Sequence, residues 1–253
     1  MAIPKPIRAA LLLCGLLLTA ACSAHNDGGS SATSAQPAAA ATTAPAPSAP
    51  SSAPVGFTEG KQYVRIAHPA QPAPTGPVVL VEVFSYGCPH CAEFAPYMDK
   101  LRAELPGGVE VRYMPAIFTP AWEPFARAFY AARQLGVLDK THDALFQAML
   151  EHYPLNSLQD LADFYSRHGV DPGKFLAAAT SPATDAEMAA DQKAEMSWGI
   201  DATPTLVIGR AASNAPDAPF VAEYRSGDFD DYAELQKIGL WLVERVETSP
   251  KTD

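Results

Sequence analysis

The feature that most constrains the fold is a run of apolar and β-branched residues that leads into a pair of closely spaced cysteines. Val78–Phe84 reads Val-Val-Leu-Val-Glu-Val-Phe, which predicts a strand buried on both faces of a sheet. The segment Cys88-Pro89-His90-Cys91 follows shortly after it, and apolar residues recur at helical spacing beyond that segment. A buried strand that passes directly into a helix predicts an α/β fold.

The first cysteine of the pair falls at the expected N-terminus of this helix. Unpaired backbone N–H groups and the helix macrodipole favour an anion there, so we expect Cys88 to be the nucleophilic thiolate. Cys91 lies one turn further inside. Pro89 lacks an N–H and fixes φ at the helix start without losing a hydrogen bond. His90 places an imidazole beside Cys88, and its protonated form attracts the thiolate.

The beginning of the chain has the layout of a secretory signal peptide. Lys5 and Arg8 precede the apolar run Ala9–Leu18, which is too short to span a bilayer as a permanent helix. Cys22 follows small residues at the end of this run, an arrangement that resembles a bacterial lipobox. This resemblance implies cleavage before Cys22 and lipid attachment to it. The alternative is ordinary cleavage nearby, for example after Ala24, which leaves a soluble periplasmic protein.

A low-complexity segment separates the signal peptide from the rest of the chain. Ser23–Pro54 consists almost wholly of Ala, Ser, Thr, Pro and Gly, and such a composition buries too little apolar surface to fold. We therefore expect a signal peptide over residues 1–21 and a lipid-anchored, disordered linker over residues 22–56. The folded part would be tethered to a membrane, in the periplasm.

The cysteine count narrows the role of the pair. The chain has four cysteines; Cys14 leaves with the signal peptide and Cys22 is taken by the lipid. Cys88 and Cys91 remain as the only thiols of the mature chain, and in an oxidising compartment they form or cycle through a disulfide. A purely structural role explains this disulfide poorly, because the stabilisation by a disulfide grows with the length of the loop that it closes.

The remaining pattern predicts one sheet interrupted by a block of helices. The order β-β-α-β, then helices, then β-β-α resembles a thioredoxin fold with an inserted all-helical domain. We expect the first half of the thioredoxin-like domain over residues 57–118, the helical insertion over 119–199 and the second half over 200–248. The expected strands are Gln62–Ala67, Val78–Tyr86, Val109–Met114, Thr205–Gly209 and Phe220–Arg225, and the expected flanking helices are Cys88–Leu105, with Pro96 kinking it, and Asp230–Val246.

Three segments of the chain resemble the DsbA family of periplasmic thiol oxidases: Glu59–Tyr63, Glu82–Cys91 and Thr203–Thr205. The resemblance implies that the chain donates its Cys88–Cys91 disulfide to unfolded or reduced secreted proteins. It also implies that no cofactor is needed besides this redox-active disulfide, and that a quinone-linked membrane partner reoxidises the thiols.

Two neighbouring residues match the substrate-binding turn of this family. Pro204 resembles the cis-proline that packs opposite the active cysteines, and Thr203 then presents its backbone to an extended substrate as a strand would. The alternative is a trans proline at the start of an edge strand. Thr203 stands where DsbA proteins usually carry valine, and threonine is familiar in disulfide isomerases. The balance between oxidation and isomerisation is therefore open.

Glu82 is a carboxylate inside an otherwise apolar strand, where burial is costly. Its position matches the buried acidic residue of the family, which helps to move protons during exchange with Cys91. Arg112 on the next strand is the expected basic partner. The alternative role is that of a plain buried ion pair.

Other aromatic and titratable residues are less specific. The apolar side chains of Phe118, Trp122, Met196 and Trp198 either line a groove for unfolded substrates or pack in the core. We expect the histidines of the helical block, His142, His152 and His168, to be surface or capping residues.

Three rival functions follow from the same residues. A reductase or an isomerase could use the same fold, and a non-catalytic tethered chaperone or metal carrier could use the cysteines only as sensors.

A structural zinc site would need two more ligands, and the mature chain has no second cysteine pair. A net charge of −10 without basic runs argues against nucleic-acid binding.

Overall fold

The computed structural model describes residues 56–67, 74–215 and 218–249. The expected signal peptide, Cys22 and nearly all of the linker lie outside these ranges. Among the described residues, no helix is both long enough and apolar enough to cross a membrane. The strands are Tyr63–Arg65 (β1), Val78–Phe84 (β2), Glu110–Pro115 (β3), Thr205–Ala211 (β4) and Phe220–Ser226 (β5). The helices are Pro89–Glu104 (α1), Pro120–Trp122 (η1, a 3-10 turn), Glu123–Gln134 (α2), Leu138–Leu150 (α3), Leu158–Arg167 (α4), Pro172–Ala179 (α5), Pro182–Trp198 (α6) and Tyr232–Thr248 (α7).

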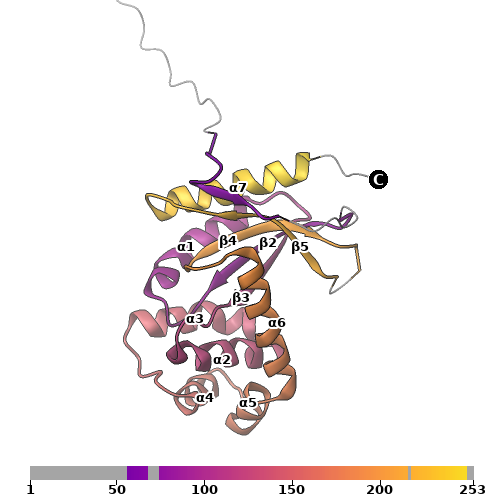
Figure 1. Cartoon of the computed structure of the whole chain (residues 1–253). Helices are drawn as coiled ribbons and strands as arrows, with labels where there is room; N and C mark the ends of the chain where they lie inside the picture. The colour runs from indigo at the N-terminus through magenta and orange to yellow at the C-terminus, as the bar shows by residue number, and fades with distance from the viewer. Residues whose placement is uncertain (1–55, 68–73, 216–217, 250–253) are drawn as a thin grey trace, which may run out of the picture. The chain divides into compact units, whose positions relative to one another are not determined.

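The described strands form one mixed sheet in the order β1-β5-β4-β2-β3 (Figure 1). β2 pairs in parallel with β3 and antiparallel with β4, and β5 pairs antiparallel with both β4 and β1. Every residue of β2 is buried, as the unbroken apolar run predicts.

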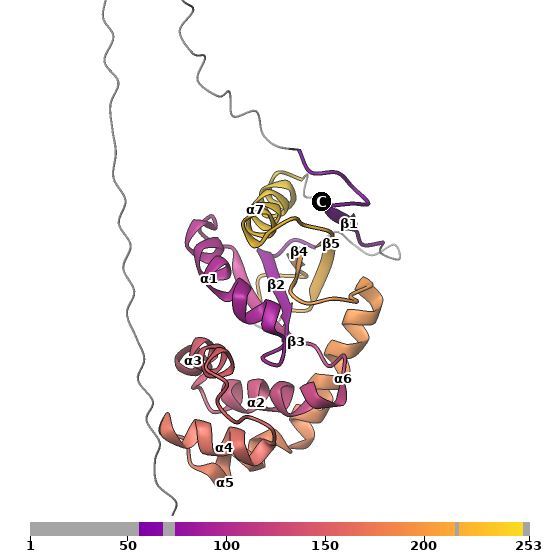
Figure 2. The same cartoon turned by 90° about the vertical axis from the view of Figure 1, so that its left-hand side faces the viewer.

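Each face of the sheet is covered by different elements. Alternate residues of a strand point to opposite faces, so Leu80 packs with α1 and α7 whereas Val79 and Val81 face the other side. α1 and α7 lie side by side in both views (Figures 1 and 2). On the other face, Trp198 at the end of α6 packs against the cluster that contains Val79.

The helices α2–α6 are inserted between β3 and β4 and build a core of their own (Figure 2). This core joins the sheet at the end of β2, because Phe84 and Tyr86 belong to the same buried cluster as the aromatic residues of α2 and α3. The fold is therefore the expected α/β thioredoxin fold with an inserted all-helical domain.

Polar side chains cap the N-termini of several of these helices. The hydroxyl of Ser157 accepts a hydrogen bond from the Asp160 N–H at the start of α4. Thr119 precedes the 3-10 turn η1, and its side chain makes no capping hydrogen bond. α6 ends at Gly199, whose φ of 66° is the left-handed conformation that glycine adopts without strain.

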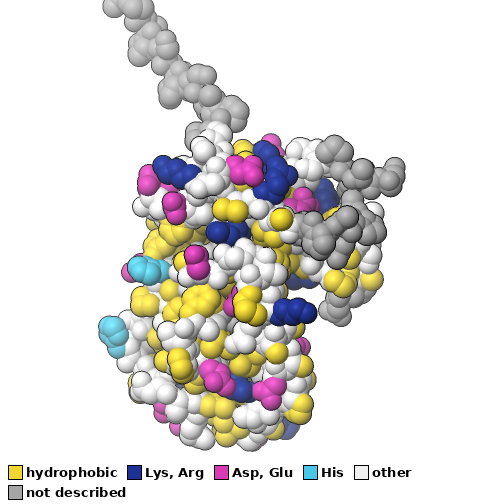
Figure 3. Space-filling model, in the orientation of Figure 1, with side chains coloured by type: hydrophobic (Ala, Val, Ile, Leu, Met, Phe, Trp, Pro, Cys, Tyr) yellow, Lys and Arg dark blue, Asp and Glu magenta, His cyan; other side chains and the backbone are white. Residues whose placement is uncertain are grey.

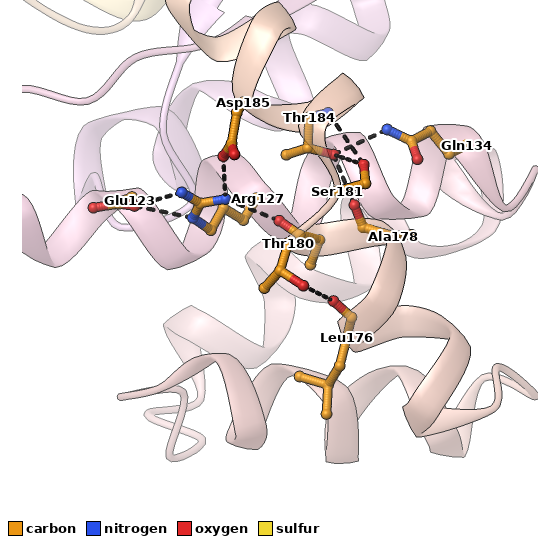
Figure 4. A network of polar contacts seen from close by, with 10 residues as sticks. Glu123, Arg127, Gln134, Leu176, Ala178, Thr180, Ser181, Thr184 and Asp185 are labelled. Carbon is orange, nitrogen blue, oxygen red and sulfur yellow. Dashed lines mark hydrogen bonds and ion pairs between the residues drawn. The ribbon is translucent and has the colours of Figure 1, made fainter.

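A polar network ties α2 to the junction of α5 and α6 (Figure 4). The Arg127 guanidinium donates to Glu123 within α2, to Asp185 on α6 at 2.8 Å and to the Ala179 carbonyl at 3.1 Å. The Thr184 hydroxyl donates to the Ala178 carbonyl at 2.8 Å. These bonds fix the sharp turn between α5 and α6.

The charged side chains on the surface are mixed in sign. On the face drawn in Figure 3, basic and acidic side chains are interspersed among apolar ones and form no continuous basic stripe. This face offers nothing resembling the positive track that nucleic-acid backbones require.

Candidate active site around Cys88

The cysteine pair lies at the junction of β2 and α1. Cys88 is the N-cap residue of α1, with extended backbone angles, and its side chain makes no capping hydrogen bond. The N–H groups of Cys91 and Ala92 bond to the Cys88 carbonyl at 3.1 and 3.3 Å. Both cysteines are free thiols, and Cys88 is 5% exposed whereas Cys91 is fully buried. The Cys88 sulfur is thus the one that a second protein can reach.

The two thiols have opposite acidities. A hydrogen bond from the Cys91 thiol lowers the pKa of Cys88 to about 5, with further help from the Thr203 side chain and despite the opposing effect of burial. Burial raises the pKa of Cys91 well above its usual range, and the Cys88 sulfur adds to this rise. At neutral pH the pair therefore holds one thiolate, on Cys88, and one proton, on Cys91.

The loop before β4 faces this thiolate. The Thr203–Pro204 peptide is cis, not trans, and Pro204 is buried. The Cys88 Sγ atom lies 3.6 Å from the Thr203 carbonyl oxygen. The structure thus brings Thr203 and Pro204 next to Cys88, although more than a hundred residues separate them in the sequence.

Glu82 is 1% exposed, and its Oε1 atom has no hydrogen-bond partner among the described residues. Burial raises its pKa to about 8, so the carboxyl group is mostly neutral at pH 7. The positive charge of Arg102 on α1 lowers this pKa in part.

The expected pairing of Glu82 with Arg112 is wrong. The parallel register places Arg112 opposite Val81 and Tyr113 opposite Glu82, so the Arg112 side chain points to the other face of the sheet. The guanidinium of Arg112 instead pairs with Glu110 at 2.7 Å.

His90 makes contacts that the sequence does not reveal. Its Nδ1 atom lies 2.9 Å from the hydroxyl of Tyr232, at the start of α7. The same hydroxyl donates to Glu93 at 2.8 Å, and the Glu93 carboxylate lies 3.6 Å from His90 Nδ1. No local signal could have predicted this contact, because Tyr232 follows His90 by 142 residues.

His142 is also placed differently from the expectation. It is buried on α3, with Nδ1 2.7 Å from the hydroxyl of Tyr86 in the loop that precedes Cys88. Burial lowers the pKa of His142 to about 3, so its ring is neutral. The prediction of a surface or capping residue is therefore wrong, and this histidine joins the helical insertion to the active-site loop.

The candidate groove residues fall into separate places. The rings of Phe118 and Trp122 lie 5.7 Å apart, and the indole of Trp122 packs on Gly87, next to Cys88. Trp198 instead packs against Phe220 at 5.5 Å, and Met196 is 75% exposed. Only Phe118 and Trp122 thus form an apolar surface beside the cysteine loop.

Metal binding is the alternative role for the cysteine pair. Within residues 56–67, 74–215 and 218–249, no three His, Cys, Asp or Glu side chains are grouped so that they could hold a metal ion.

Comparisons with known proteins agree with this geometry. A family model described as the DSBA-like thioredoxin domain matches residues 79–224. The "Thiol:disulfide interchange protein DsbA" of Pseudomonas aeruginosa is 34% identical over 153 residues, which cover 60% of this chain and 72% of the relative. The protein of the same name from Burkholderia cepacia is 34% identical over 168 residues, covering 64% of this chain and 74% of the relative.

Solved structures give the same result. The crystal structure of Pseudomonas aeruginosa DsbA superimposes with a TM-score of 0.62 at 30% identity, over 75% of this chain and 94% of that one. The oxidoreductase DsbA from Xylella fastidiosa superimposes with a TM-score of 0.64 at 29% identity, over 75% of this chain and 97% of that one. The chain therefore belongs to the family of DSBA-like thioredoxin domains and is a thiol:disulfide oxidoreductase.

Proposed function

We propose that the chain is a periplasmic dithiol oxidase, which donates the Cys88–Cys91 disulfide to secreted proteins through a mixed disulfide at Cys88. The observation that carries this proposal is the opposite acidity of the two thiols. A pKa of about 5 at Cys88, against 9.0 for an ordinary cysteine, stabilises the reduced form of the pair. At pH 7 this difference is worth about 3 kcal/mol, or roughly 60 mV for a two-electron couple. A stabilised dithiol makes the corresponding disulfide a strong oxidant.

The exchange proceeds in two balanced steps. A substrate thiolate attacks the Cys88 sulfur, the Cys88–Cys91 bond breaks, and Cys91 leaves as a thiolate that takes up a proton. A second thiolate of the substrate then attacks the substrate sulfur of the mixed disulfide and releases the Cys88 thiolate. The substrate has lost two electrons and gained a disulfide, and the pair on this chain has gained both electrons.

Different residues serve the two halves of this reaction. The depressed pKa of Cys88 makes it the better leaving group in the second step, because sulfurs of lower pKa leave faster. Glu82 is the one buried acid in β2, and its raised pKa lets it hold a proton that the departing Cys91 thiolate requires. Pro89 starts α1 with the fixed φ that suits the first position of a helix.

Substrate binding is assigned to Thr203 and Pro204. The Thr203 carbonyl is within hydrogen-bond distance of the Cys88 sulfur, so an extended peptide that pairs with this backbone has its own cysteine next to Cys88. The exposed side of Phe118 and the ring of Trp122 would contact apolar residues of an unfolded substrate.

The cellular setting is part of the same proposal. Lipid attachment at Cys22 would tether the domain to a membrane through the linker, and a quinone-linked membrane enzyme would return the pair to the disulfide. No cofactor besides the disulfide is required, because thiolate and disulfide exchange electrons directly. A Cys22→Ser variant should move from the membrane fraction to the soluble fraction; an unchanged distribution would reject the lipid anchor.

The mechanism is tested by trapping. A Cys91→Ser variant keeps the Cys88 nucleophile but lacks the second thiol, which would attack the mixed disulfide and release the substrate. A substrate cysteine that is pre-activated as a mixed disulfide should therefore react with Cys88 and remain attached to it as a stable complex. Cys88→Ser is the matched control and should trap nothing and oxidise no reduced test protein. Trapping that is equally efficient in Cys88→Ser would reject the assignment. Activity that survives the loss of both cysteines would favour the non-catalytic chaperone or carrier.

A further inference from the structure

The histidine between the two cysteines is held by a residue from the far end of the chain. Tyr232 is the first residue of α7, and its hydroxyl lies 2.9 Å from His90 Nδ1 and 2.8 Å from Glu93 Oε2. His90 and Glu93 lie on the first turns of α1, and their side chains are largely exposed. Burial restricts an exposed side chain very little, so the orientation of His90 depends on its contacts with Tyr232 and Glu93.

The Tyr232 hydroxyl has one proton and two candidate acceptors. A hydrogen bond to a carboxylate is stronger than one to a neutral imidazole nitrogen, so the proton goes to Glu93. The hydroxyl oxygen is then left as an acceptor toward His90, and Nδ1 must carry a proton. The three groups form a chain of donors that runs from His90 through Tyr232 to the Glu93 carboxylate.

We propose that Tyr232 is a positioning residue, which fixes the orientation and the Nδ1–H form of His90 and thereby sets the oxidising strength of the cysteine pair. The second half of this statement rests on the proposed function, whereas the first half concerns the side chains alone.

The ring of Tyr232 is itself well anchored. It contacts Phe94 and Tyr97 of α1 at centroid distances of 6.0 and 5.9 Å, and Phe229 at 6.0 Å. The hydroxyl is therefore presented by packed aromatic rings on two helices, and not by a freely rotating side chain.

The consequence for Cys88 follows from charge. When His90 is protonated, Nδ1–H donates to the Tyr232 oxygen and the Glu93 carboxylate stands 3.6 Å from the ring. Both contacts hold the His90 ring on the first turn of α1, the helix end whose unpaired N–H groups stabilise the Cys88 thiolate. Loss of the hydroxyl removes the contact without disturbing the aromatic packing.

The test compares Tyr232→Phe with Tyr97→Phe in the full mature chain. Each substitution removes one hydroxyl from the same aromatic group, but only that of Tyr232 contacts His90. In equilibrium with reduced and oxidised glutathione, Tyr232→Phe should lower the equilibrium constant for oxidation of glutathione about threefold, or about 15 mV, and Tyr97→Phe should leave it unchanged. The effect is modest because water screens exposed contacts.

A double-mutant cycle shows whether the effect passes through His90. In a His90→Ala background, Tyr232→Phe should produce no further change in the equilibrium constant. The same threefold change in that background would overturn the proposal, as would equal effects of Tyr232→Phe and Tyr97→Phe.

The nitrogen chemical shifts of His90 test the positioning role without any redox reaction. In mildly alkaline solution the wild-type ring should have its proton on Nδ1. Tyr232→Phe should move the proton to Nε2, and so should Glu93→Ala, since the hydroxyl is then free to donate to Nδ1. A wild-type ring with its proton on Nε2 would overturn the proposal. If instead the wild-type pair proves no stronger an oxidant than glutathione, the proposed function fails, and the chemical shifts still decide the role of Tyr232.

Discussion

The buried carboxyl group of Glu82 leads to a quantitative prediction about stability. In the folded chain its pKa is about 8, against 4.5 for an ordinary glutamate, and burial is the main cause. A group whose pKa is raised by folding binds its proton more tightly in the folded state. The folded state is therefore favoured at low pH, and this advantage is lost as the pH rises from 4.5 through 8.

The size of the effect follows from the two pKa values. Integrated from pH 4 to pH 9, the titration of Glu82 lowers the free energy of unfolding by about 4 to 5 kcal/mol, and about 3 kcal/mol of this is already lost at pH 7. Glu82→Gln keeps the shape of the side chain and removes the titration. The free energy of unfolding of the variant, relative to the wild type, should therefore rise by this amount between pH 4 and pH 9.

The assay is urea unfolding at several pH values with the two cysteines oxidised, so that neither thiol titrates. The Cys88 charge is the smallest contribution to the pKa of Glu82, so oxidation changes the expectation little. The cost of burying the glutamine amide is the same at each pH and cancels from the slope. Glu244→Gln, at an exposed position on α7, is the control for the loss of a carboxyl group outside the core. A constant difference between Glu82→Gln and the wild type from pH 4 to pH 9 would refute the raised pKa.

Three further predictions concern the cysteine loop and its supports. The pKa of Cys88 in the folded chain is depressed to about 5, so ionisation of this thiol stabilises the folded state at high pH. In urea unfolding, the reduced wild type should therefore be more stable than reduced Cys88→Ser above pH 9, and it should lose this advantage as the pH falls through 5. Gly87→Ala places a Cβ atom 2.8 Å from the Trp122 ring and should lower the midpoint of thermal unfolding, at a cost of about 1–3 kcal/mol; an unchanged midpoint would contradict this contact. His142→Phe leaves the buried Tyr86 hydroxyl without its hydrogen-bond partner and should lower the free energy of unfolding by about 1–3 kcal/mol. An equal free energy of unfolding in the variant and the wild type would mean that water replaces the imidazole.

The sequence predicts those parts of the structure that depend on neighbouring residues. An unbroken apolar run specifies β2, because a strand covered on both faces needs apolar side chains throughout. Ser157 specifies the start of α4, because its hydroxyl reaches an N–H three residues ahead. The cysteine pair at a helix start predicts a reactive thiol for the same local reason.

Relations between distant segments are harder to predict. Arg112 is on the expected strand, but the register of that strand places it opposite Val81, and one residue of register decides which face a side chain occupies. The contacts of His90 with Tyr232 and of His142 with Tyr86 join residues that are 142 and 56 positions apart. Neither pair leaves a pattern within a single helix or strand, so a single sequence could not reveal them.

The measurement that tests the central claim most directly is the equilibrium redox potential of the Cys88–Cys91 pair against a glutathione buffer. The chain with Cys14→Ser and Cys22→Ser has this pair as its only cysteines. A stabilised Cys88 thiolate predicts a potential clearly more oxidising than the glutathione couple, which lies at roughly −240 mV. A potential near the −270 mV or so of thioredoxin would contradict the account and assign the chain to disulfide reduction.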